Sequence, residues 1–531
     1  MLLVLALAAG PTSAATGARQ PATIPHVLRF ATGSDISSLN PHLSNDGALG
    51  YLASMTMAWL TKTGSHGEIV PELLTTLPTQ TNGGISADGR TITWHLRRGV
   101  RWSDGAPFDA DDVVFSLRTV LNPATNEISR DGWDLITRID EPDKYTVAIH
   151  LKTRYSPQAE TFFSSSAANP CILPKHLLGK LATINAADYN ALPVGIGPFR
   201  YTAWKRGDRV ELAANPFYFR GRPKLERVEY LIVPDVNTIL TRMQTHEIDL
   251  WLPITGAFYQ RVRALPGVNV LRQPSYFYDH LDFNLAHPVV NELAVRRALR
   301  FALDRVQMRD TIRHGLGTVT ESVFGPNHPA YHPIPLAPHD VAQARALLAA
   351  AGWKPGPDGV RRKHGVRLAL TLVASTGSPE IDALIELIRA DWQTIGVELN
   401  VKRVLFSRLF AAPQAGGIVK GGEFDAVLFA WGLDSLGELN PLYGCNAFTP
   451  GGQNDMHWCN RRADAAMQRF ITEYDAQRRA ADDAVVSTAL AHDVPTIVID
   501  IRDLIAAYNR DLKNWHPNVI APFDDMLNVD I

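Results

Sequence analysis

The chain has 531 residues, and its content of 46% hydrophobic and 20% charged residues is typical of a globular protein. Such a length exceeds what one core can use, so it predicts about three domains or an elaborated two-lobe architecture. The 52 lysines and arginines nearly balance the 54 acidic residues for a net charge of -2, which excludes nucleic acid and anionic lipid because no basic field would attract them.

The first residues form a predicted targeting segment. An apolar run from Leu2 to Gly10 has the length of a signal-peptide core, and small residues follow at Thr12 to Ala15. We expect cleavage near Ala14-Ala15, which makes residues 1–25 a signal peptide and disordered tail. The run is too short to span a bilayer. No Lys or Arg precedes the apolar run, and a basic region lost upstream of the given start would explain this absence. No Cys directly follows the run, so we expect no lipid anchor. The alternative is an apolar tail.

The next elements are a strand and a helix. Residues 26–47 begin with a short alternating strand and continue into polar turn residues around Asn40-Pro41. One helix and the connection EIVPELLTTLP account for residues 51–80. The later stretch EISRDGWDLITRIDEPDKYTVAIHL is strand and turn material, to which we assign no chemistry.

The clearest local pattern lies between Arg90 and Leu121. Apolar residues alternate with polar ones from Ile92 to Trp102, which is the period of a half-buried strand, and SDGAP then predicts a turn. Asp109 is a suitable N-cap, with Asp112 three residues further on, for a helix with one apolar stripe. By composition alone these residues are scaffold.

Glycines open the segment from Val194 to Leu250. Gly195-x-Gly197-Pro198 suggests a nucleotide loop, but Arg200 stands where the third glycine of that motif belongs, so we interpret both glycines as turn residues. Two alternating strands and a helix from Val236 to Thr245 follow.

A further helix is predicted after residue 290, with Gly315 as an end signal and a core stripe on one face. That stripe consists of Val295, Ala298, Leu299, Ala302 and Val306. Beyond it, His328, His332 and His339 lie among prolines. A metal site is conceivable there, but a solvated Pro-rich linker is the favoured interpretation because such residues do not hold a coordination geometry.

Residues 340–505 alternate helices and strands, as α/β lobes do. Helices are predicted at 340–351 and 379–395, and strands at 367–373 and 397–401. The most apolar strand, Phe424 to Trp431, delivers Gly432-Leu433-Asp434 to its carboxyl end, where ligands of open α/β sheets gather. The last strand, Thr496 to Ile501, follows Pro495 and is expected at a sheet edge.

Three cysteines remain. Cys445 and Cys459 flank a loop rich in Gly, Pro and Asn, and in an exported chain the pair predicts a disulfide, with Cys171 as a small buried hydrophobe. His457, two residues before Cys459, could instead form half of a metal site with it, which is the weaker interpretation because no second Cys/His pair has a suitable spacing.

Three segments carry a family resemblance. DGRTITWHLRRGVRWSDGAPFDADDVVFSL, at residues 88–117, resembles the signature of family 5 substrate-binding proteins, the dipeptide, oligopeptide and nickel receptors of ABC importers. VGIGPF, NPFYF and HEIDL then resemble the family's GTGPY, NPxYW and GEID landmarks, and YDHLDFNLAHP with VRRALRFALDR is the third match. The resemblance spans nearly all of residues 26–531, with the landmarks in family order.

The resemblance implies an α/β, two-lobe periplasmic-binding-protein-like fold with a two-segment hinge. We expect lobe I at residues 26–285 with an inserted subdomain at about 63–190, lobe II at 286–505, and a return to lobe I at 506–531. It also implies a periplasmic monomer without cofactor or metal, which captures its ligand by lobe closure and delivers it to the transmembrane permease subunits of an ABC importer.

The same resemblance implies where the ligand binds. Trp431 and Asp434, in AWGLDSLGELNPLYG, match the segment where peptide-binding members keep a Trp and an Asp to hold the first residue of the ligand. A turn or capping role after a strand is the structural alternative for Asp434. We add Leu433 and Phe115 to the candidate ligand-binding residues.

A second candidate region is the loop after the LNPH motif. The resemblance places Ser44, Asn45 and Asp46 near the ligand, but some peptide-binding relatives have Glu where this chain has Asn45. That difference puts a charge-based contact at Asn45 in doubt.

Peptide is the favoured ligand class, because an extended backbone can pair with strand edges whatever its side chains are. Nickel chelates, opines and oligosaccharides, which relatives bind on this fold, stay open. The hypothesis from another class is a periplasmic hydrolase with scattered carboxylates. The chain has no GxSxG, HExxH or Walker A sequence, and no Ser/His/Asp set can be assigned by spacing.

Overall fold

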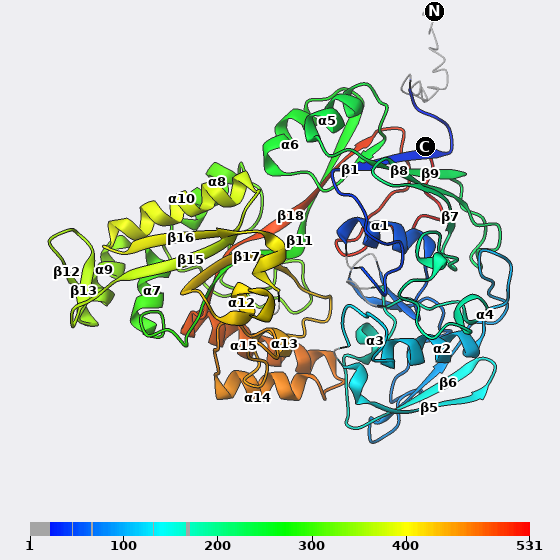
Figure 1. Cartoon of the computed structure of the whole chain (residues 1–531), viewed down its shortest axis with the longest axis horizontal. Coiled ribbons are helices and arrows are strands. Elements are labelled where there is room, and N and C mark those ends of the chain that lie inside the picture. The colour runs from blue at the N-terminus through cyan, green and yellow to red at the C-terminus, as the bar shows by residue number, and fades with distance from the viewer. Residues whose placement is uncertain (1–21, 45, 65–66, 131, 166–169, 412) are drawn as a thin grey trace, which may run out of the picture.

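The computed structural model of the chain describes residues 22–44, 46–64, 67–130, 132–165, 170–411 and 413–531. Figure 1 shows two lobes, one built from the first half of the chain and its C-terminal end, the other from most of the second half. One sheet continues through both, in the order β16-β15-β17-β11-β18-β10-β1-β9-β8-β7. The predicted leader and cleavage site fall within residues 1–21, outside the described residues.

Among its described residues, the first lobe combines five strands of the large sheet with two small antiparallel sheets and six α-helices. Its large-sheet strands are β1 (Val27–Thr32), β7 (Phe199–Lys205), β8 (Arg209–Ala214), β9 (Arg227–Ile232) and β10 (Leu250–Trp251). The small sheets contain β2 (Thr61–Thr63), β3 (Ile69–Pro71), β4 (Thr91–His95), β5 (Ile136–Asp143) and β6 (Thr146–Leu151). The helices are α1 (Gly47–Thr56), α2 (Ala110–Leu121), α3 (Gln158–Thr161), α4 (Lys175–Leu178), α5 (Val236–Gln244) and α6 (Gly256–Arg263).

The second lobe places helices on both faces of its part of the large sheet. Its strands are β15 (Ala369–Ser375), β16 (Glu398–Val404) and β17 (Ala426–Gly432), with a separate small sheet of β12 (Lys354–Pro355), β13 (Arg361–Lys363) and β14 (Val366–Arg367). The helices are α7 (Leu293–Ala302), α8 (Arg305–Ile312), α9 (Val341–Ala350), α10 (Pro379–Thr394), α11 (Phe406–Leu409), α12 (Ile418–Gly421), α13 (Asn440–Tyr443), α14 (Arg461–Phe470) and α15 (Ala476–Asp493).

Two long strands connect the lobes. β11 (Val268–Phe283) and β18 (Thr496–Asn509) pair antiparallel along most of their length, and both run from one lobe into the other (Figure 1). β18 therefore extends well past Ile501, and the predicted edge position is wrong because β11 and β10 flank it. Charged Arg502 and Asp503 interrupt the apolar pattern of this strand, so its second half has no strand signature in the sequence.

The strand, turn and helix predicted between Arg90 and Leu121 are present. β4 is shorter than the alternating pattern, and α2 begins where expected, since Asp109 accepts a hydrogen bond from the Asp111 amide at 3.1 Å. Asp109 and Asp112 form a capping box. The Asp112 carboxylate also accepts from Trp102 Nε1 at 3.0 Å, which ties the helix start to the segment before the turn.

Gly195 and Gly197 allow two backbones to approach closely. A Cβ at Gly195 would lie 2.0 Å from the Thr56 carbonyl oxygen, and one at Gly197 would lie 2.5 Å from that of Met55. The glycines therefore pack against the end of α1, which explains them without any phosphate.

The single helix predicted from Val295 to Val306 is wrong. α7 ends at Ala302, and α8 starts again after Asp304, whose carboxylate accepts from the Gln307 amide at 2.9 Å. Because this cap turns the chain, Val306 is 42% exposed and does not belong to the core stripe.

Separate apolar clusters fill the two lobes. In the first lobe, Phe30 of β1 packs with Phe523 near the C-terminus, whereas in the second Phe283 of β11 packs with Trp392 of α10. No helix among the described residues combines the length and apolarity needed to cross a bilayer.

Candidate functional site

β17 carries the strongest sequence candidates to the junction of the lobes. It pairs with β15 only as far as Leu428 but with β11 as far as Gly432. Within the described chain, the backbone from Phe429 to Gly432 therefore has no strand partner on the β15 side. Such an edge can hydrogen-bond an added extended segment.

Aromatic rings surround this free edge. The Trp431 ring lies 5.8 Å from that of Phe410 and 5.4 Å from that of Phe429. On β11, Phe277 pairs with Gly432 and is 50% exposed, and Phe406 of α11 is 65% exposed. The end of β17 thus offers apolar surface beside unpaired backbone groups.

Asp434 follows directly. Its carboxylate accepts a hydrogen bond from the Gly437 amide at 2.7 Å, so the turn role proposed as the alternative is present. Burial nevertheless raises the pKa of Asp434 above its usual range, because the loss of water outweighs the stabilising amides of Gly437, Glu438 and Leu436. The group is a poorly solvated carboxylate, which a cation would stabilise.

His328 supports this turn from behind. Its Nε2 lies 2.7 Å from the Asp434 carbonyl oxygen, and its Nδ1 accepts from the Ala330 amide at 3.0 Å, which places the proton on Nε2. Burial lowers its pKa to about 4, so the ring is neutral at pH 7. The expectation of a solvated histidine linker is therefore wrong for His328, although His332 and His339 are exposed.

Glu160 of α3 reaches the same turn from the first lobe. One carboxylate oxygen accepts from Ser435 Oγ at 2.6 Å and the other from the Leu436 amide at 3.0 Å. Glu160 and Ser435 are each 5% exposed. Burial raises the pKa of Glu160 well above its usual range, and the negative charge of Asp434 raises it further.

The loop after the LNPH motif is held locally. Ser44 Oγ accepts from Ser37 Oγ at 3.1 Å, and Asp46 accepts from the amide and the hydroxyl of Ser37 at 2.9 and 2.7 Å. Nearby, His42 Nδ1 lies 2.6 Å from Glu127 Oε1. Among the described residues, no hydrogen bond joins Ser44 or Asp46 to Trp431 or Asp434.

The remaining sequence candidates differ in their surroundings. Asn45 lies outside the described residues. Leu433 is buried in the core beside Tyr278, and Phe115 packs against the core of the first lobe. Their surroundings favour a packing role over ligand binding for both Leu433 and Phe115.

Cys445 and Cys459 form the predicted disulfide, and Cys171 is a buried free thiol. Residues 445–459 therefore form a covalently closed loop next to α13. No group of His, Cys, Asp and Glu in the described part of the chain could hold a metal ion.

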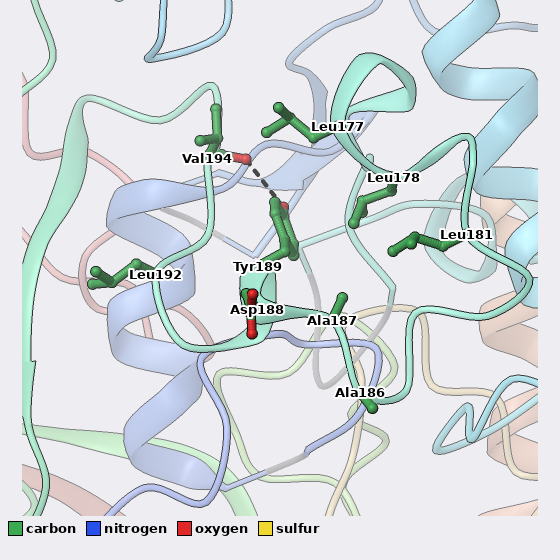
Figure 2. A pocket seen from close by; sticks show the side chains of 9 residues that line it. All are labelled: Leu177, Leu178, Leu181, Ala186, Ala187, Asp188, Tyr189, Leu192 and Val194. Atoms are coloured by element: carbon green, nitrogen blue, oxygen red, sulfur yellow. Dashed lines mark hydrogen bonds between the residues drawn. The ribbon is translucent and has the colours of Figure 1, made fainter.

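A separate hollow of about 560 Å³ lies in the first lobe beside α4 (Figure 2). Four leucines and Tyr189 are among the residues that line it, and the Tyr189 hydroxyl donates to the Val194 carbonyl at 3.0 Å. None of the sequence candidates is among its lining residues.

Sequence reasoning missed Glu160, Tyr155 and Arg479 near the Asp434 turn. The Tyr155 hydroxyl lies 3.4 Å from Glu438 Oε2, and Arg479 of α15 interacts electrostatically with Glu160. Glu160 lies in a helix of four residues and its partner stands 275 positions later, so no local pattern could have identified it.

The chain is similar in sequence to a family of bacterial binding proteins. The family described as "Bacterial extracellular solute-binding proteins, family 5 Middle" matches residues 68–453. Protein XP55 of Streptomyces lividans is 31% identical over 442 residues, which cover 80% of this chain and 75% of that protein. Oligopeptide-binding protein AppA of Bacillus subtilis is 25% identical over 464 residues, which cover 86% and 82%.

Solved structures share the fold. AppA from Bacillus subtilis, solved with a nonapeptide, matches with a TM-score of 0.79 over 95% of this chain and 98% of that chain, at 22% identity. NikA from Brucella suis, solved with Fe(III)-EDTA, matches with a TM-score of 0.81 over 95% and 99%, also at 22% identity.

Proposed function

Since the chain belongs to the family 5 bacterial extracellular solute-binding proteins, which serve ABC importers, we propose that it captures peptides between its two lobes. It then delivers them, in the periplasm, to the permease subunits of the importer, and it acts as a monomer. β11 and β18 are the hinge segments, because they are the strands that both lobes share.

One observation carries the peptide assignment. Asp434 is a desolvated carboxylate that follows Trp431 by three residues, just beyond the unpaired edge of β17. A peptide has the matching parts in the matching order: a terminal ammonium followed by an extended backbone. The ammonium pairs with Asp434, and the backbone adds to the edge at Phe429–Gly432.

The energetics favour a charged amine over a neutral group at this position. Asp434 has already lost much of its water, so pairing it with a cation recovers free energy that a neutral ligand could not supply. Trp431 adds a ring face to which a cation is attracted. The aromatic surface formed by Phe277, Phe406 and Phe410 accommodates apolar side chains of the ligand.

The ligand is returned unreacted. The family consists of binding proteins, and in this chain the candidate carboxylates are engaged by backbone amides or by serine. A hydrolase would be revealed by turnover of a peptide in the presence of the pure protein.

Native mass spectrometry of the protein purified under mild conditions tests the proposal. We expect one bound peptide per chain, released intact by acid. A bound metal chelate, such as NikA holds in its solved structure, or a sugar in place of a peptide would contradict the peptide assignment, and repeated cleavage of added peptide would contradict the binding role.

A further inference from the structure

The two lobes touch at a small set of hydrogen bonds, which we name the interlobe contact. In the first lobe it comprises Gly89, Tyr155, Ser156 and Glu160. In the second lobe it comprises residues 435–438 and 470–474. Figure 1 shows the segment around α3 facing the helices α14 and α15.

Direct bonds define this contact. Glu160 accepts from Ser435 and Leu436, as described above. In addition, the Ser156 amide donates to the Ile471 carbonyl at 2.8 Å, and the Ser156 hydroxyl donates to the Phe470 carbonyl at 2.7 Å. The Tyr474 hydroxyl donates to the Tyr155 carbonyl at 3.3 Å. Rotation of the lobes about β11 and β18 would break these bonds and return Glu160 to water. We therefore expect the Glu160 carboxyl group to be more exposed in an open form than in this structure, where it is 5% exposed.

The charges around Glu160 are predominantly negative. The negative charge of Asp434 acts on Glu160 directly, and Asp483 of α15 interacts with Asp434 in turn. Burial, with the charges of Asp434 and Asp482, raises the pKa of Asp483 to about 9. The guanidinium of Arg479 is the cation that interacts with both Glu160 and Asp483. Among the described residues, the titratable groups around this contact are the acids Asp434, Glu438, Glu473, Asp475, Asp482 and Asp483, the arginines Arg154, Arg469 and Arg479, the tyrosines Tyr155, Tyr276 and Tyr474, and, behind Asp434, His328.

We propose that Glu160 couples closure of the lobes to proton uptake, so that acid favours the closed form. Closure moves the Glu160 carboxyl group from water to a buried position against Asp434. In that position a proton removes the repulsion between the two carboxylates, and the hydroxyl of Ser435 and the amide of Leu436 can still donate to the carboxyl oxygens.

The direction of the pH effect on closure follows from proton linkage. A carboxyl group whose pKa is higher in the closed form than in the open form binds more protons in the closed form. The closed-to-open ratio therefore increases as the pH falls toward the ordinary pKa of glutamate, by up to about tenfold per pH unit for each proton taken up. This inference concerns closure of the protein without ligand, and it rests on the proposed function only for the two-lobe motion.

Small-angle X-ray scattering of the ligand-free protein at pH 8 and pH 5 tests the inference. We expect the radius of gyration to decrease at pH 5. Glu160→Gln should lose most of this pH response, because Gln carries no charge at either pH. Glu226→Gln, which changes an exposed glutamate of the same lobe, should keep the full response.

A second variant separates charge from contact. Ser435→Ala removes one donor to Glu160 without changing any charge, so we expect a less closed protein at both pH values with the pH response retained. An unchanged radius between pH 8 and pH 5 in the unaltered protein would overturn the inference, as would a full response in Glu160→Gln or its loss in Ser435→Ala. Addition of a peptide with a free amino terminus at pH 8 tests the proposed function independently, since compaction by such a peptide does not require proton uptake at Glu160.

Discussion

At the scale of single residues, the second lobe contains a buried pair of carboxyl groups apart from the proposed site. Asp282 of β11 and Asp455 of the disulfide loop are 1% and 2% exposed, and His280 Nδ1 lies 2.8 Å from Asp282 Oδ1. Burial raises the pKa of Asp455 well above its usual range, and the charge of Asp282 raises it further. Asp455 therefore keeps its proton to a higher pH in the folded protein than in the unfolded chain.

This pair should make the stability of the protein depend on pH. Above about pH 4 an unfolded chain loses the Asp455 proton, whereas the folded protein retains it, so the free energy of unfolding should fall as the pH rises toward the raised pKa. Asp455→Asn resembles the protonated acid and should flatten this slope, with a gain of roughly 1–3 kcal/mol at pH 7. Urea unfolding at pH 5 and pH 8 measures the effect. Asp310→Asn, at an exposed position, is the control; equal slopes for Asp455→Asn and the unaltered protein would refute the assignment.

Some residues of the candidate site could be predicted from the sequence and others could not. Asp434 and Trp431 could be selected because they follow an apolar strand in a characteristic order. Glu160 and His328 could not, because each acts through a partner more than 100 positions away and neither lies in a periodic segment. Prolines around His328 correctly indicate a loop but contain no information on its burial.

At the scale of elements, helices with a cap and an apolar stripe were predictable almost to the residue. α2 begins after Asp109 and α10 begins at Pro379, as the capping residues indicate. The break between α7 and α8 was not predicted, because the apolar spacing continues through it although Asp304 caps a new helix. The length of β18 was not predicted, because charged residues interrupt its apolar pattern and are paired only in the folded protein. Arg502 of β18, for example, donates to Asp279 of β11 at 2.6 Å.

The disulfide loop is an element whose contribution can be measured. Cys445 and Cys459 are separated by 14 positions, and closing a loop of that size should stabilise the fold by roughly 3 kcal/mol on the chain-entropy account. Replacing both by serine should lower the free energy of unfolding in guanidinium by about that amount. Peptide mapping of the unreduced protein should leave Cys171 unpaired, and a disulfide containing Cys171 would refute the pairing.

At the scale of the whole molecule, the order of family landmarks predicted two α/β lobes better than any single element did. What the sequence could not supply was their relative position, since it depends on the long pairing of β11 with β18 and on the interlobe contact. Buried charges accompany the shared strands. Asp279 accepts from Arg313 and Arg502 at 2.6 Å each. Such a network defines the register of β11 against β18 but contributes little net stability.

The two-lobe mechanism predicts that ligand compacts the molecule. A ligand that contacts both lobes shifts the population toward the closed form and raises the melting temperature by mass action. Scattering at pH 8 with and without saturating peptide should show a smaller radius of gyration with peptide. Stabilisation with an unchanged radius would indicate binding to one rigid surface and would exclude closure.

In the proposed binding mode, Asp434 pairs with the terminal ammonium of a peptide. Calorimetric titration of one peptide and its N-acetylated twin against the unaltered protein and Asp434→Asn gives the four affinities that test it. We expect the substitution to weaken binding of the free-amine peptide by roughly 2–5 kcal/mol, because it removes one side of a buried charge pair. The acetylated peptide should bind weakly to both proteins and lose little on substitution. Equal losses for the two peptides would contradict the account and would leave Asp434 only its turn bond to Gly437.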